Sequence, residues 1–284
     1  MQRIVLFLCT LWACSTGAHE QLRIVAAGAS VTEIVFALDR GDHVVATDST
    51  SYYPHAAAEL TKLGYFRQLS TEGVLAQNPT HVLGAAATGP DAVLQQLEAA
   101  GVRVIKYNHP RTLDGLLGMI GDIGEDLDAT ANANTLKLQV KHSIDTVLQS
   151  SAAAQVKGKK ALYVVANNDR GLTVAGSHTL PDALFSELGM HNIASSLNEY
   201  KLMSNESVMQ ANPDVIFMAS HFGSDQAAIE ALCAHPAIAM THAGKQCAVT
   251  PLSSATSLGL SPRVADTLAQ IVEATVATET QQRD

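Results

Sequence analysis

Short apolar runs alternate with longer amphipathic segments over two stretches of the chain, residues 22–110 and 160–262. The clearest apolar runs are residues 22–27, 43–47, 81–84, 102–107, 161–166 and 214–219. Runs of this length, followed by Gly, Ser or Asn and separated by helix-length segments, indicate buried parallel strands of α/β units. The pattern therefore predicts two similar α/β lobes, each with a parallel-rich sheet flanked by helices.

The segment between the two stretches, residues 128–154, contains neither Gly nor Pro. Its apolar residues Leu136, Val140, Ile144 and Val147 recur at helical spacing. A helix of about 25 residues is nearly 40 Å long, which is enough to join two lobes and to restrict their hinge motion. We therefore divide the chain into a leader (1–18), an N-terminal lobe (19–127), a linker helix (128–154) and a C-terminal lobe (155–284).

An internal repeat supports this division. Residues 70–82 (STEGVLAQNPTHV) and 204–216 (SNESVMQANPDVI) are nearly alike, and each predicts a Ser-capped helix that Asn-Pro ends before a strand. Only the first copy follows the sequence GYFRQL, so we expect the lobes to differ in chemistry there. A separate Ser-x-x-Glu pattern at residues 30–33 predicts a capping box on the first helix.

The amino terminus predicts export. Residues 1–18 contain one cation, an apolar run and small residues before a cleavage site after Ala18, which is typical of a secretory signal peptide. A lipoprotein signal with Cys14 as the modified residue is the alternative. No later stretch is apolar for the roughly 20 residues of a membrane span, and the net charge of -9 argues against nucleic-acid binding. We expect a monomer in the periplasm of a Gram-negative bacterium.

Two of the four cysteines lie in the predicted leader, which leaves Cys233 and Cys247. An oxidising compartment favours a disulfide between them, and a pair of free buried thiols is the alternative.

Tyr65 is the residue with the most distinctive candidate chemistry. It lies between Gly64 and Phe66 and two residues before Arg67. Tyrosine is an axial ligand of haem iron in some proteins, and a neighbouring cation and ferric iron both favour the phenolate. The spacing alone favours the alternative, a loop tyrosine packed at the edge of its lobe.

Three segments resemble the haem-binding periplasmic proteins of bacterial ABC haem-uptake systems, which are class III solute-binding proteins: residues 28–38 (GASVTEIVFAL), 64–75 (GYFRQLSTEGVL) and 99–102 (AAGV). The resemblance implies ferric haem b bound between two lobes, with Tyr65 as axial ligand and Arg67 hydrogen-bonded to its oxygen. It also implies delivery to an inner-membrane ABC permease and no enzymatic activity. Glu72 and Glu206 match the positions that dock on the permease in this class, although helix capping explains them too.

Ligands of open parallel sheets bind beyond the carboxyl ends of the strands, so the loops there provide further candidates. Candidate haem contacts, for which surface or core packing is the alternative, are Ser30, Phe66, Tyr107, Arg111, Asn168, Arg170, Tyr200, Met203, Ser220 and Phe222. His178 and His221 are candidates for a second axial bond.

Three other functions compete with haem delivery. A cobalamin or ferric-siderophore binding protein has the same fold and needs no axial tyrosine. A haem chaperone or sensor needs no permease. An exported hydrolase or metalloenzyme is disfavoured because the sequence has no G-x-S-x-G elbow and no clustered metal-ligand motif.

Overall fold

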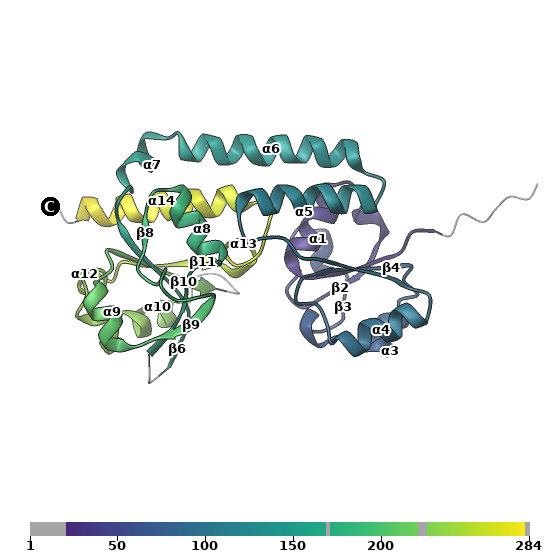
Figure 1. Ribbon diagram of the computed structural model, residues 1–284, viewed down its shortest axis with the longest axis horizontal. Coiled ribbons are helices and arrows are strands. Elements are labelled where there is room, and N and C mark those ends of the chain that lie inside the picture. Colours follow the sequence, from purple (N-terminus) through teal and green to yellow (C-terminus); the bar gives the residue numbers. More distant parts are fainter. Residues whose placement is uncertain (1–20, 169–170, 221–225, 282–284) are drawn as a thin grey trace, which may run out of the picture.

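Two α/β lobes lie side by side in the computed structural model, which describes residues 21–168, 171–220 and 226–281 (Figure 1). The predicted leader, with its cleavage site and the alternative at Cys14, lies outside the described residues. Each lobe has a sheet flanked by helices, and the sheets are rich in parallel pairs, as the sequence predicted.

The N-terminal lobe has a five-stranded sheet in the order β3-β2-β1-β4-β5, and all of its pairs are parallel. Its strands are β1 (Ile24–Ala27), β2 (Val44–Thr47), β3 (Thr61–Lys62), β4 (His81–Ala85) and β5 (Arg103–Tyr107). Its helices are α1 (Ala29–Ala37), η1 (Gly41–His43), α2 (His55–Ala58), η2 (Phe66–Gln68), α3 (Thr71–Leu75), α4 (Asp91–Ala99) and α5 (Leu113–Asp126). The carboxyl ends of the parallel strands share one edge, where the loops gather.

The C-terminal lobe has a mixed sheet in the order β11-β10-β6-β7-β9, with β8 paired to β6. Its strands are β6 (Lys160–Asn168), β7 (Gly171–Ala175), β8 (His191–Asn192), β9 (Tyr200–Met203), β10 (Val215–Ser220) and β11 (Val249–Ser253). Its helices are α8 (Leu180–Glu187), α9 (Asn205–Ala211), α10 (Gln226–Cys233), α11 (Pro236–Ala239), α12 (His242–Lys245), α13 (Ser254–Ser257) and α14 (Val264–Gln281). Strand β7 runs antiparallel to both of its neighbours, β6 and β9. Because β7 pairs with the end of β6, strand β6 continues through Asn168, where the sequence indicated a loop.

One long helix, α6 (Thr130–Leu148), joins the lobes as the sequence predicted, but it ends before residue 154 and a short second helix, α7 (Ser151–Gln155), follows it. Helix α6 has 19 residues and is therefore about 28 Å long. The break has a local cause, because the Ser150 hydroxyl accepts a hydrogen bond from the Ala153 N–H at 3.1 Å and starts a new helix.

One hydrophobic core cluster extends through both lobes, and each lobe has a further cluster of its own. The shared cluster joins Ile34 and Leu116 of the N-terminal lobe, Ile144 of α6, and Leu184 and Leu268 of the C-terminal lobe. Helix α6 packs against both α5 and α14 along the upper side of Figure 1. Because apolar burial is shared across the connection, moving one lobe against the other disturbs packed side chains, and large hinge motions are disfavoured.

The repeated segments form the predicted helix and strand in each lobe. The Ser70 hydroxyl accepts a hydrogen bond from the Gly73 N–H at 3.1 Å, and the Ser204 hydroxyl accepts one from the Ser207 N–H at 3.2 Å. Asn78 and Asn212 both adopt positive φ, 48° and 51°, which ends the helix before Pro and the next strand.

The capping box predicted at residues 30–33 is wrong. Gly28 is the N-cap of α1, and no side chain caps that helix, whereas Ser30 lies within it. The Glu33 carboxylate is buried and points to the C-terminal lobe instead, where it pairs with Arg263.

Cys233 and Cys247 form a disulfide with a Cα–Cα distance of 5.3 Å, and this links the end of α10 to the segment before β11. The cross-link therefore fastens the outer helices of the C-terminal lobe to its sheet.

Candidate ligand-binding cleft

Tyr65 lies on the N-terminal lobe at the loop edge of the sheet, just after β3 and before η2. Its side chain is 40% exposed, and its ring meets that of Phe66 edge-on at a centroid distance of 4.8 Å. Phe66 is partly buried against the core of its own lobe. The Gly64 carbonyl accepts a hydrogen bond from the Ser49 N–H at 2.7 Å, so the Tyr65 segment is fastened to the loop after β2.

Arg67 places its guanidinium over both aromatic rings. Its central carbon lies 5.9 Å from the centroid of Tyr65 and 5.4 Å from that of Phe66. The cation is close to the phenol, but it faces the ring rather than the hydroxyl oxygen. The hydrogen bond that the resemblance implies between Arg67 and that oxygen is not a contact of this structure and stays a prediction.

A second arginine of the N-terminal lobe reaches the opposite lobe. The Arg111 guanidinium lies 5.6 Å from the ring centroid of Tyr200, the first residue of β9. Burial raises the pKa of Tyr200, while the charges of Arg111 and Arg67 act in the lowering direction. Tyr200 is therefore close to both arginines, and the three side chains lie where the two lobes face each other.

Arg67 and Arg111 differ from the other arginines in the described part of the chain. The other four donate to carbonyl or carboxylate oxygens: Arg23, Arg40, Arg103 and Arg263. Within the described ranges, Arg67 and Arg111 contact aromatic rings and have no hydrogen bond or ion pair. In a chain of net charge -9, two guanidinium groups without an anionic partner favour an anionic ligand between the lobes.

The loop after β2, residues 48–54, lies at the same edge of the sheet, as expected for a loop that follows a parallel strand. The buried Asp48 carboxylate accepts hydrogen bonds from the Gly28 N–H at 2.9 Å and from the Ser51 hydroxyl at 2.6 Å. The Lys62 ammonium donates to the Ser51 carbonyl at 2.6 Å, and burial lowers its pKa. These contacts fix a loop that presents Tyr52 and Tyr53, both about half exposed.

Other predicted contacts have different surroundings. Met203 is 8% exposed in the core of the C-terminal lobe, and Tyr107 is 5% exposed and donates to Asp126 at 3.0 Å. Such burial leaves neither side chain a free face for a ligand.

His178 is exposed and its Nδ1 lies 3.0 Å from the Asn198 amide oxygen. Ser30 lies against Gly259, and the Ser220 carbonyl accepts from the Ser254 hydroxyl. The following candidates lie outside the described residues: Arg170, His221, Phe222 and the side chain of Asn168.

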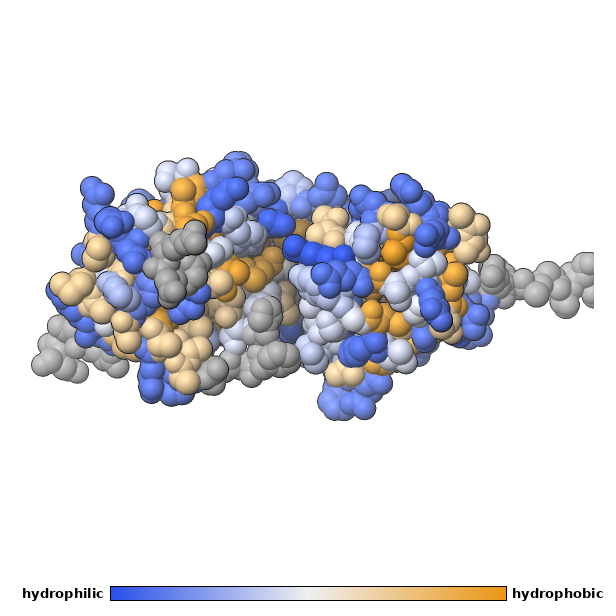
Figure 2. All heavy atoms as spheres, turned by 90° about the horizontal axis from the view of Figure 1, so that it is seen from below, coloured by the Kyte–Doolittle hydropathy of each residue, from blue (hydrophilic) through white to orange (hydrophobic). Residues whose placement is uncertain are grey.

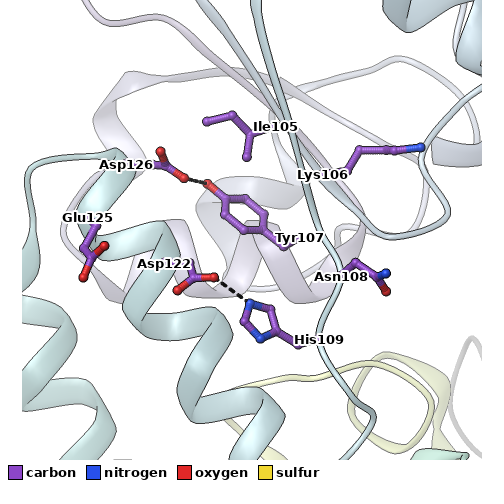
Figure 3. A pocket seen from close by; sticks show the side chains of 8 residues that line it. All are labelled: Ile105, Lys106, Tyr107, Asn108, His109, Asp122, Glu125 and Asp126. Atoms are coloured by element: carbon purple, nitrogen blue, oxygen red, sulfur yellow. Dashed lines mark hydrogen bonds and ion pairs between the residues drawn. The ribbon is translucent and has the colours of Figure 1, made fainter.

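A polar pocket of about 410 Å³ lies elsewhere, between β5 and α5 (Figure 3). It contains the Tyr107–Asp126 hydrogen bond and a His109–Asp122 contact of 2.9 Å, and neither Tyr65 nor Arg67 lines it. Within the described ranges, no group of three or more His, Cys, Asp or Glu side chains is arranged to hold a metal ion. A ligand that brings its own metal needs no such group.

Glu72 and Glu206 are exposed on α3 and α9, and neither forms an ion pair within the described ranges. Both helices lie on the lower side of Figure 1, opposite α6. Figure 2 views the molecule from that side and shows a hollow between the lobes. The two helices that carry these glutamates therefore lie on the side of the molecule at which the hollow opens.

Two similar lobes that face each other across such a hollow are the architecture of a solute-binding protein. The family model "Periplasmic binding protein" matches residues 24–255, and the chain belongs to this family. It is an extracytoplasmic solute-binding protein of an ABC transporter, a transport component without enzymatic activity. Among the described residues, no helix is both long and apolar enough to cross a membrane.

The chain is similar to solved structures of heme-binding proteins and, in sequence, to vitamin B12-binding proteins. The periplasmic heme-binding protein RhuT from Roseiflexus sp. RS-1 is 31% identical with a TM-score of 0.84, over 91% of this chain and 99% of that one. The periplasmic heme-binding protein HutB of Vibrio cholerae is 32% identical with a TM-score of 0.77, over 89% and 98%. The vitamin B12-binding protein of Vibrio parahaemolyticus is 26% identical over 79% of this chain and 81% of its own.

Proposed function

We propose that the protein binds ferric haem between its lobes and delivers it to an ABC permease of the inner membrane. The Tyr65 phenolate is the axial ligand of the iron, and Arg67 favours the ionised phenol through its charge. Arg67 and Arg111 bind the haem propionates, and Phe66 and Tyr200 cover part of the macrocycle. Glu72 and Glu206 dock on the permease, one from each lobe.

The observation that carries this proposal is the pair of arginines without anionic partners beside an exposed tyrosine. Haem has two carboxylates that can pair with the arginines, and an iron with a vacant axial position that the tyrosine can fill. Cobalamin, the ligand in the name of one relative, has amide groups in place of free carboxylates and its cobalt already carries axial ligands. The site chemistry therefore favours haem, as do the names of the two structural relatives at about 30% identity.

The test is a titration of the purified protein with ferric haem, followed by absorption spectroscopy. Tyr65→Phe keeps the ring and removes the oxygen. We expect it to weaken binding by about 100-fold or more, because loss of an outer-shell group alone costs a metal site about 10–100-fold. The phenolate-to-iron charge-transfer absorption should disappear with it.

Tyr107→Phe is the matched control, since Tyr107 is a tyrosine of the same lobe whose hydroxyl donates to Asp126 in a separate pocket. It should bind haem with the affinity and spectrum of the parent. An unchanged spectrum in Tyr65→Phe, or a loss in Tyr107→Phe, would refute the ligand assignment. Competition by cyanocobalamin at equal concentration would favour the rival function.

A further inference from the structure

The two lobes are joined by a polar contact as well as by helices. Glu33 on α1 is 4% exposed, and its carboxylate accepts hydrogen bonds from Arg263 Nε at 3.0 Å and Arg263 Nη2 at 2.7 Å. The Ser261 hydroxyl donates to the same carboxylate at 2.5 Å. Glu33 belongs to the N-terminal lobe, whereas Ser261 and Arg263 immediately precede α14 of the C-terminal lobe. The contact therefore spans the boundary between the lobes.

The same guanidinium also reaches the loop that forms part of the cleft wall. Its central carbon lies 3.9 Å from the ring centroid of Tyr53, so the cation is stacked on the ring. Tyr53 belongs to the loop after β2 that Asp48 fixes and that is hydrogen-bonded to the Tyr65 segment through Gly64. Arg263 is thus bound at once to helix α1 and to the cleft loop, both in the opposite lobe.

Gly259 of the C-terminal lobe lies close to Ser30 of α1 beside this contact. A Cβ added to Gly259 would lie 2.4 Å from the Ser30 hydroxyl oxygen, so a larger residue would require that hydroxyl to move. The close approach and the bidentate pair fix both the distance and the rotation of α1 relative to the segment before α14. A buried carboxylate with three donors leaves its partners only at a large cost, which makes this contact a rigid joint.

We propose that Glu33, Ser261, Arg263 and Tyr53 form an inter-lobe clamp that sets the width of the cleft and holds the Tyr53 loop against the C-terminal lobe. These are positioning residues, since they act on the ligand through the geometry of the cleft. Sequence reasoning assigned Glu33 to a helix cap, so this function comes from the tertiary structure alone. The effect on haem rests on the proposed function, while the effect on lobe geometry does not.

The first test measures the distance between spin labels at Glu98 of α4 and Gln210 of α9, both exposed, in a full chain with Cys9 and Cys14 replaced by serine. Arg263→Gln should broaden the distance distribution by about twofold, because a hinge that loses its fixed contact samples more orientations. Arg263→Lys keeps the charge but loses the bidentate geometry of the guanidinium, so its distance distribution should be of intermediate width. Arg103→Gln, which breaks an ion pair within one lobe, is the matched control and should leave the distribution unchanged.

The second test measures haem release. Arg263→Gln should release haem about tenfold faster with an unchanged absorption spectrum, since differences in affinity appear mainly in dissociation rates. An Arg263→Gln distribution as narrow as that of the parent would overturn the clamp, as would broadening of equal size in Arg103→Gln. If Arg263→Gln does not fold, the same distance distribution is measured in Arg263→Lys and Ser261→Ala, and widths equal to that of the parent would overturn the clamp. A broadened distribution in a protein that does not bind haem would reject the proposed function and leave the clamp in place.

Discussion

The two lobes share a helix and a strand that are nearly the same in sequence, but they differ in what precedes the helix. In the N-terminal lobe, α3 follows the 3-10 turn η2, and the turn leaves Tyr65 and Arg67 exposed. In the C-terminal lobe, α9 follows strand β9, which pairs with β7, and Met203 at its end is buried.

The difference shows how a scaffold can be repeated while its chemistry is not. A turn has no partner strand, so its side chains are free to project from the edge of the sheet. An edge strand alternates its side chains between two faces, so half of them enter the core. The N-terminal lobe thereby exposes Tyr65, the predicted axial ligand, and the C-terminal lobe presents Tyr200, whose ring contacts Arg111 of the N-terminal lobe.

The largest effect should come from removing Arg67 and Arg111, the two arginines of the N-terminal lobe that contact aromatic rings. Hydrogen bonds to charged groups are worth about 1.5–3 kcal/mol each, so Arg67→Gln with Arg111→Gln should weaken haem binding by about 100-fold or more. Lys201→Gln is the control, because Lys201 is an exposed cation that precedes α9 as Arg67 precedes α3. It should have little effect in the same titration.

The dimethyl ester of haem sharpens this prediction, because it keeps the iron and loses both carboxylates. The parent should prefer the free acid, and the double variant should bind the two forms alike. Equal affinity of the parent for both forms would contradict a role for the arginines in binding propionates.

The second prediction concerns the disulfide, which is found in the C-terminal lobe. A loop of about 15 residues contributes about 3 kcal/mol to the free energy of unfolding, so Cys233→Ser with Cys247→Ser should destabilise the protein by about that amount. Calorimetry provides the measurement. Because one core spans both lobes, we expect a single transition at a lower temperature. A separate early transition would mean that the lobes unfold independently.

The smallest effect should come from charge reversal at Glu72 and Glu206, the residues proposed to dock on the permease. Glu72→Lys and Glu206→Lys should each lower haem transport by about fivefold, because an exposed charge pair is worth about 1 kcal/mol or less. Similar losses in both variants would indicate that the lobes dock symmetrically. Haem affinity measured in solution should be unchanged, because both carboxylates are exposed on α3 and α9. Normal transport in the double variant would exclude docking through these residues.

Local signals predicted much of the fold. Apolar runs indicated the strands, and the Ser and Asn-Pro pairs indicated α3 and α9, because capping and helix termination depend on neighbours along the chain. The linker helix was predicted too long, because the Ser150 hydroxyl caps a new helix there and the spacing of apolar residues does not reveal that local effect. The capping box on α1 was wrong because Glu33 pairs with Arg263 of the other lobe, and no local pattern shows that contact.

The sequence by itself determined the two-lobe α/β plan and placed Tyr65 and Arg67 next to each other, since both follow from periodicity and from residues adjacent in the chain. Only the tertiary structure brought Arg111 to Tyr200 and Glu33 to Arg263, because those pairs join different lobes. Contacts between residues 89 and 230 positions apart depend on how the lobes pack around a shared core, and no local pattern of the chain encodes that packing.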